Sequence, residues 1–157
     1  MPTPKALTAM LVAGAVLAAG ASTAAVLQGA QAAKARMEHM KALGKSSKAV
    51  FEQVKGGAPD MAIVKVEAPK IAAASRDLPG WFPAGSGQKA EPKSHALPVI
   101  WTDRAGFETK AKALVVAAAR LDAVAQAGDA AGVGPAFHDV GAACKGCHET
   151  FKAKDKD

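Results

Sequence analysis

Cys144-Lys145-Gly146-Cys147-His148, near the C-terminal end of a 157-residue chain, is the stretch that decides the fold. Two cysteines separated by two residues and followed at once by histidine form the spacing at which haem is attached covalently. In this arrangement two thiols add to the haem vinyl groups and the next residue supplies an imidazole to the iron, so Cys144 and Cys147 are the expected attachment points and His148 is an expected iron ligand. The motif therefore predicts a protein with one covalent haem c.

The motif makes physical sense on a helix, where residues three and four apart share a face. Both cysteines and the histidine then lie on one side. The same helical period runs through Phe137, Val140, Gly141, Cys144, His148 and Phe151. We therefore expect the attachment face to be a buried face, with haem as part of the core.

Other uses of these residues fit less well. A redox Cys-x-x-Cys requires a strand and a helix in a βαβ context, and the upstream sequence shows no strands. Structural zinc requires four ligands, whereas only three candidates cluster here. A disulfide between Cys144 and Cys147 would close a very small loop and would leave His148 unexplained. A haem-free thiol or metal protein is thus a remote alternative.

Two amphipathic stretches precede a long connection. The first covers about 33–54 and stops at Gly56-Gly57, and its apolar face contains Met37, Met40, Leu43, Val50, Phe51 and Val54. The second is capped by Asp60, ends before residue 77, and carries Met61, Val64, Ala68, Ile71 and Ala72. Pro69 lies inside it and should kink or split the helix, because proline removes a backbone donor. Residues 79–100 are rich in Gly, Pro, Ser and Lys and show no helical period.

Two further stretches follow the connection. The third is capped by Thr102 or Asp103 and ends at Gly128, and its buried stripe is Phe107, Ala111, Leu114, Ala118, Leu121 and Ala125. Gly132 and Gly134 should delay the fourth, with Pro135 in its first turn and its end near residue 154. Strand signals are nearly absent. The pattern predicts an all-α antiparallel four-helix bundle with covalently bound haem.

The first segment does not belong to that bundle. Lys5 precedes an apolar run over residues 7–19, which small residues follow, in the order of a secretory signal. We expect residues 1–32 to be a leader cleaved after Ala32, within Ala30-Gln31-Ala32, with cleavage after Ala25 as the alternative, and residues 33–157 to be the haem-binding domain. The alternative is an uncleaved anchor, but the run is shorter than the roughly 20 apolar residues of a membrane span. Loss of Lys5 lowers the formal charge from +6 to +5, so the domain is basic.

The second axial position must be filled from upstream, because residues 149–157 contain neither methionine nor histidine. The candidates are Met37, Met40, Met61, His39, His95 and His138. His138 lies on another face of the motif's own helix, and His95 lies in a loop. Met40 is the best-placed distal residue, although many methionines only fill cores. If its sulfur binds iron, the protein is a six-coordinate electron carrier; otherwise the iron is five-coordinate and open to small gases.

These motifs resemble those of the class II c-type cytochromes, the group of cytochrome c′ and its low-spin relatives. Besides the haem motif, the resemblance is carried by Lys34-Ala35-Arg36-Met37-Glu38-His39-Met40, by residues 78–83 and by Ile100-Trp101-Thr102-Asp103. It covers nearly all of the chain after the leader. Because cytochrome c′ is itself a known four-helix bundle, the resemblance implies the fold as well.

The resemblance implies roles for two further residues. Arg36 falls where the family places an arginine near a haem propionate, and its alternative is an exposed helix residue. Met40 occupies a position that is non-bonding in cytochrome c′ and an iron ligand in the low-spin branch. Two departures stand out. Lys152 replaces a frequent arginine, and the connection between Phe82 and Val99 is long, as in the low-spin branch.

The resemblance also implies export to the periplasm and a homodimer through the first two helices. We expect a one-electron carrier between periplasmic redox proteins rather than an enzyme. The alternative is a five-coordinate protein that binds nitric oxide or carbon monoxide at an open distal face. The positive charge favours acidic partners. Nucleic acid is not expected to bind, since no basic stripe with interleaved aromatic residues is present.

Overall fold

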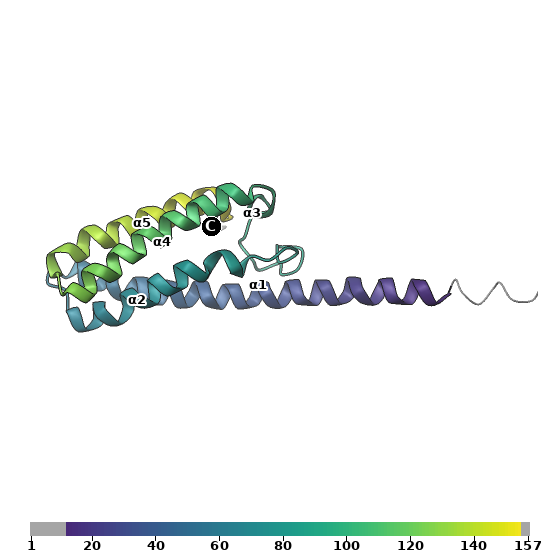
Figure 1. Ribbon diagram of the computed structural model, residues 1–157, viewed down its shortest axis with the longest axis horizontal. Coiled ribbons are helices and arrows are strands. Elements are labelled where there is room, and N and C mark those ends of the chain that lie inside the picture. Colours follow the sequence, from purple (N-terminus) through teal and green to yellow (C-terminus); the bar gives the residue numbers. More distant parts are fainter. Residues whose placement is uncertain (1–11, 155–157) are drawn as a thin grey trace, which may run out of the picture.

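The computed structural model describes residues 12–154, with side chains from residue 26 onward, and is built from helices. The long ones are α1 (Val12–Lys55), α2 (Met61–Asp77), α4 (Arg104–Ala127) and α5 (Ala130–Phe151). Two short ones, η1 (Leu78–Trp81) and α3 (Val99–Thr102), lie in the long connection. Helices α1 and α2 form one layer and α4 and α5 the other (Figure 1), which confirms the antiparallel four-helix bundle.

Helix α1 is longer than expected, because it extends upstream of residue 33 to Val12. Its alanine-rich sequence contains neither proline nor paired glycines between residues 12 and 33, and alanine is the strongest helix former. The helix ends where predicted, before Gly57, which adopts a positive φ of 76°. Most of the expected leader cannot be compared with the structure. Residues 1–11 lie outside the described part of the chain, and the side chains of residues 12–25 are not described. Among the described residues, none of the helices combines the length and hydropathy required of a membrane span.

Helix α2 begins at the predicted cap, where the Asp60 carboxylate accepts a 2.8 Å hydrogen bond from the amide of Ala62. A kink or a split is expected at Pro69, and the split is wrong, since the helix continues through Pro69 to Asp77. Proline removes the donor that would serve the carbonyl of Lys65. The side chain of Gln126 on α4 donates to that carbonyl instead, at 3.5 Å. A neighbouring helix thus offsets part of the cost of the proline.

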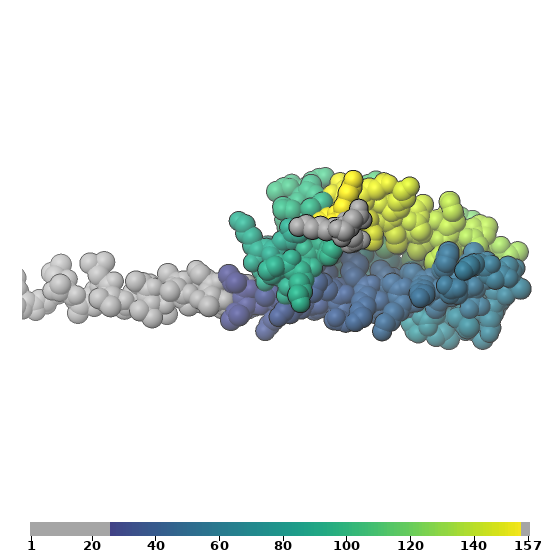
Figure 2. Space-filling view, turned by 180° about the vertical axis from the view of Figure 1, so that it is seen from behind, coloured from purple at the N-terminus to yellow at the C-terminus, as the bar shows by residue number. Residues whose placement is uncertain are grey.

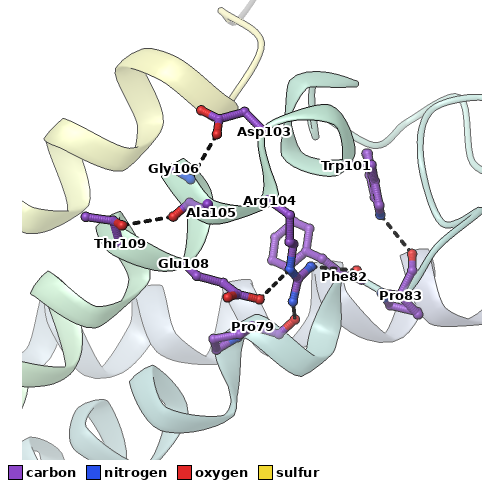
Figure 3. Close-up of polar contacts among 10 residues, drawn as sticks. All are labelled: Pro79, Phe82, Pro83, Trp101, Asp103, Arg104, Ala105, Gly106, Glu108 and Thr109. Carbon is purple, nitrogen blue, oxygen red and sulfur yellow. Dashed lines mark hydrogen bonds and ion pairs between the residues drawn. The ribbon is translucent and has the colours of Figure 1, made fainter.

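Helix α4 has the predicted ends. Asp103 caps it by accepting from the amide of Gly106 at 3.0 Å (Figure 3), and Gly128 closes it with a φ of 74°. All six residues of the predicted stripe are buried. Phe107 is the first residue of this stripe. Its ring centre lies 4.8 Å from that of Phe82 and 5.4 Å from that of Phe151. Three segments of the chain therefore meet at one aromatic cluster.

Helix α5 begins earlier than expected, at Ala130, and ends at Phe151 rather than near residue 154. The carboxylate of Asp129 accepts from the amide of Gly132 at 3.0 Å and so caps the helix before the glycines. A β-carbon at Gly132 would lie 2.4 Å from that carboxylate, so glycine permits this cap rather than delaying the helix. Pro135 lies inside the helix, not in its first turn.

Two predicted apolar faces need correction. Phe51 on α1 is 49% exposed, whereas Val50 beside it is fully buried. On α5, Val140 and Phe151 are buried as expected, but Gly141 and His148 are exposed. A helical period spreads over a wide arc, and the packing of neighbouring helices decides which edge of that arc is covered.

The long connection is held by arginines from both layers. On α4, Arg104 donates to the carbonyls of Phe82 and Pro79 at 3.1 and 2.9 Å and pairs with Glu108 (Figure 3). From the other layer, Arg36 of α1 donates to the carbonyls of Trp81 and Ser86 at 3.3 and 2.8 Å. A segment without regular structure needs such partners, because buried carbonyls left unpaired are costly.

Candidate haem site

A cavity of about 420 Å³ lies between the two layers, at the end of the bundle that the long connection covers. Its walls come from α1, from the connection, from α4 and from α5. Apolar side chains dominate, including Met37, Met40, Leu43, Leu78, Phe82, Ile100, Phe107, Leu114 and Phe151. Its size and apolar walls are those of a pocket for a small molecule or cofactor.

All three residues of the haem motif line this cavity. Cys144 and Cys147 lie one helical turn apart on α5 and are half-buried free thiols. His148 follows on the same helix with an exposed side chain. The three residues therefore lie on one side of α5, as predicted, and this side borders the cavity.

Burial raises the pKa of both thiols, because the apolar walls disfavour a thiolate. At Cys147, the neighbouring Cys144 raises the pKa further, while the positive charge of Lys110 opposes the rise. Lys110 lies on α4 beside the motif, where a β-carbon at Gly146 would be 3.8 Å from its Nζ. Both thiols are therefore less acidic than an ordinary cysteine thiol.

The other readings of the motif find no support in the described part of the chain. No group of three or more His, Cys, Asp or Glu side chains is arranged there to hold a metal ion. The two thiols are not joined by a disulfide. The only pairing of extended backbone among residues 12–154 is an isolated bridge between Ala96 and Lys152, so the strand and helix of a redox motif are missing.

Met40 lines the cavity from α1, in the layer opposite the haem motif, together with Met37. Both side chains are half-buried. His39 between them is exposed and stacks on Trp81 with ring centres 4.9 Å apart. His138 is exposed beside Asp139 and does not line the cavity. His95 is exposed in the connection as expected, but it also lines the cavity.

Arg36 is buried, with 3% of its surface exposed, which rules out the alternative of an exposed helix residue. Nη1 donates to Ser86 Oγ at 2.9 Å and Nη2 to Ser94 Oγ at 2.8 Å, in addition to the two carbonyls. Its guanidinium also lies 4.7 Å from the centre of the Phe82 ring. Burial lowers the pKa of Arg36 from its very high ordinary value. A propionate contact remains a prediction, and Nε is the only donor of this guanidinium without a described hydrogen bond.

Several lining residues could not be identified from the sequence. Ser94 and Ala96 belong to a stretch without helical period, and Lys110 resembles any other exposed lysine of α4. The connection is joined to the end of α5 by hydrogen bonds from Leu97 N to Phe151 O at 3.0 Å and from Ala153 N to His95 O at 2.8 Å. The one available signal that the connection packs on a core was its apolar content. This Gly- and Pro-rich stretch contains Trp81, Phe82 and Ile100.

The donor set fits haem c. Two thiols and an imidazole on one helix face a thioether on another, across apolar walls, and Arg36, Lys110 and Lys152 bring positive charge to the lining. Haem carries two carboxylates, so cations at its edge are complementary. The residues needed to attach such a group, to ligate its iron and to balance its charge are thus present in one cavity.

Comparisons with known proteins point the same way. Residues 31–152 match the family model described as cytochrome c′. Cytochrome c′ of Pararhodospirillum photometricum is 40% identical over 117 residues, which cover 74% of this chain and 92% of the relative. The structure of cytochrome c′ from Rubrivivax gelatinosus superposes with a TM-score of 0.72 at 28% identity, over 79% and 96% of the two chains. The nitric oxide complex of a single-residue mutant of cytochrome c′ from Alcaligenes xylosoxidans gives 0.73 at 31% identity, over 81% and 97%.

Proposed function

The chain belongs to the cytochrome c′ family, whose members bind haem c covalently, and from this premise we propose that it is an exported one-electron carrier. The observation that carries the proposal is the meeting of Met40 from α1 and His148 from α5 in one cavity. Haem bound there supplies a reversible change between ferric and ferrous iron. The protein's part is to hold that group, to ligate it and to shield it.

Cys144 and Cys147 would hold the haem through thioether bonds, and His148 would be its proximal ligand. Their common helix fixes the spacing of the three side chains, because residues three and four apart lie on one face. Helix α5 is itself fixed at its end, where Phe151 packs on Phe107 and its carbonyl pairs with Leu97. A rigid support of this kind holds ligands in place in both oxidation states.

Met40 would be the distal ligand. Its thioether lies in the layer facing the motif and is held by a helix rather than by a loop. Ligation by histidine and methionine would raise the reduction potential of the bound haem. It would also leave no open position for a substrate, which supports a carrier rather than an enzyme.

The walls of the cavity would tune the site further. Apolar residues exclude water, and a low dielectric disfavours charge on the bound group. Arg36, Lys110 and Lys152 act in the opposite direction by favouring its carboxylates. For Arg36, whose terminal nitrogens are engaged by the connection, we propose a propionate contact through Nε together with this long-range charge effect.

We assign the protein to the periplasm, with residues upstream of the bundle acting as the leader. The net charge, which is +5 once Lys5 is removed with the leader, supports acidic redox proteins as partners, because opposite charge accelerates encounter. A homodimer through α1 and α2 belongs to the same proposal. The family and the sequence of the leader support the periplasmic location, the positive charge supports acidic partners, and the family resemblance supports the dimer.

The test is the optical spectrum of the haem-loaded protein with two matched variants. Met40 and Met37 both line the cavity from α1, so Met40→Ala and Met37→Ala remove the same side chain from neighbouring positions. We expect narrow low-spin bands in the reduced wild type and in Met37→Ala, and broad high-spin bands in Met40→Ala. A high-spin wild type that Met40→Ala leaves unchanged would disprove ligation by Met40.

That disproof would favour the second candidate, a five-coordinate protein that binds nitric oxide or carbon monoxide beside Met40. The relative from Alcaligenes xylosoxidans, solved as a nitric oxide complex, is the observation in its favour. The two functions differ in one readout, since carbon monoxide should shift the reduced spectrum at once in a five-coordinate protein. With Met40 bound, carbon monoxide must first displace the thioether, so the shift should be slow or incomplete.

A further inference from the structure

The folded domain begins before residue 33, where the sequence placed its start. Val26 and Leu27 at the edge of the described side chains are 61% and 60% exposed. Burial begins at Gly29, and Ala33 is fully buried. One turn of helix that the sequence assigned to the leader is therefore part of the packed structure.

Gly29 packs directly against the long connection. A β-carbon at this position would lie 2.4 Å from the carbonyl oxygen of Gly85 and 3.5 Å from the β-carbon of Ala90. Only glycine fits, because the obstacle is backbone that cannot rotate away. The connection lies over this part of α1 in Figure 2, where the teal segment covers the purple start of the coloured chain. The contact joins α1 to the segment that closes the cavity.

Cleavage after Ala32 would damage this arrangement in two ways. It would remove Gly29 and the turn of helix that covers Ala33, which has no exposed surface while that turn is present. It would also place a new α-ammonium group on Ala33, three residues before the buried Arg36. Arg36 would then lie in the first turn of the helix, where the helix dipole disfavours a cation. All four hydrogen bonds of Arg36 go to neutral oxygens, so nothing described there offsets the added positive charge.

We propose that the leader is removed at the Ala25–Val26 bond and that residues 26–32 remain in the mature protein. Hydrolysis consumes one water and leaves a carboxylate on Ala25 and an ammonium group on Val26. Val26 is exposed, so that ammonium group is solvated. The residues before the bond, Ser22-Thr23-Ala24-Ala25, are small, as a signal peptidase requires. This inference rests on the proposed export and adds where the exported chain begins.

The direct test is the intact mass of the haem-loaded protein purified from a bacterial host that attaches haem to exported proteins. A chain that begins at Val26 supports the inference. A chain that begins at Ala33 overturns it and leaves export standing. A full-length chain of 157 residues that carries haem overturns the inference and leaves export standing, whereas a full-length chain that never acquires haem overturns export as well, so the two failures are distinguishable.

Two pairs of variants test the same point independently. Ala25→Phe should block processing and Ala32→Phe should not, as the masses of the accumulated chains will show. The opposite pattern would overturn the proposed cleavage at the Ala25–Val26 bond.

Gly29→Ala should lower the Tm of the mature protein by about 4 °C or more, because a β-carbon cannot fit. Gly141→Ala is the control, since nothing lies within 4 Å of a β-carbon there. An unchanged Tm in Gly29→Ala would mean that the mature chain lacks this contact.

Discussion

Arg36 Nη2 donates a 2.8 Å hydrogen bond to Oγ of Ser94, a residue 58 positions further along the chain. This bond ties the helix that carries Met40 to the segment that pairs with the end of the haem-binding helix. The two sides of the cavity are therefore linked through the long connection rather than only through the bundle. Side chains that line the cavity therefore affect haem binding, whereas side chains that hold the long connection affect stability. Variants can distinguish the two effects.

Arg36→Ala should destabilise the haem-loaded protein by about 3 kcal/mol, because buried oxygens of the connection lose their donor. Arg36→Lys should recover less than half of this loss, since an ammonium group lacks the planar fork. Guanidinium chloride unfolding measures both. Arg120→Ala is the control, whose exposed pair with Asp139 contributes about 1 kcal/mol or less. Equal effects of Arg36→Ala and Arg120→Ala would refute a cross-linking role.

Phe107→Ala should cost about 3–5 kcal/mol, because this fully buried ring joins Phe82 and Phe151 in the aromatic cluster. The loss should also loosen the end of α5, which carries the haem motif. Thermal unfolding followed by far-UV circular dichroism gives the change in stability. Val116→Ala on the same helix removes a side chain that is 65% exposed, and it should leave the Tm nearly unchanged.

Pro69→Ala should stabilise the protein by about 1–3 kcal/mol, because it restores a helical donor to the carbonyl of Lys65. The gain should fall below the full cost of a helical proline, since Gln126 already serves that carbonyl. Urea unfolding of Pro69→Ala, and of Pro69→Ala combined with Gln126→Ala, separates the two contributions. A decrease in stability on Pro69→Ala would show that the proline is required for packing instead.

Replacing both Cys144 and Cys147 with alanine should abolish covalent attachment, so that haem is extracted completely by acidified organic solvent. The single variant Cys144→Ala should retain one thioether bond, through Cys147. The mass of the denatured chain reports each case directly. Retention of haem by the double variant after denaturation would show that another residue forms the bond.

His148→Ala should change the axial ligation while leaving thioether attachment possible, since the two cysteines are untouched. We expect altered absorption bands in both oxidation states, with the mass of the attached group preserved. His138→Ala is the matched control on the same helix, because its side chain is exposed beside Asp139 and away from the cavity. Unchanged bands in His148→Ala would mean that another residue is the proximal ligand.

The sequence predicted the helices well wherever local signals agreed. Asp60, Asp103 and Gly128 mark helix ends through hydrogen bonds and backbone angles within a few residues, so the caps could be identified without knowledge of the fold. The stripe of α4 follows from its period alone. The start of α5 was misplaced because Gly132 reads as a breaker, whereas the Asp129 cap requires a residue without a side chain there.

The amino-acid sequence by itself determined the cofactor, because its attachment depends on five consecutive residues, and it determined the all-α class, because caps and helical periods are local. Tertiary structure alone decided the burial of Arg36, the continuity of α2 through Pro69 and the point at which the folded domain begins. Each of these depends on a partner far away in the chain, on Ser94, on Gln126 and on Gly85. Local patterns do not encode such contacts, which arise only when the two layers and the connection pack together.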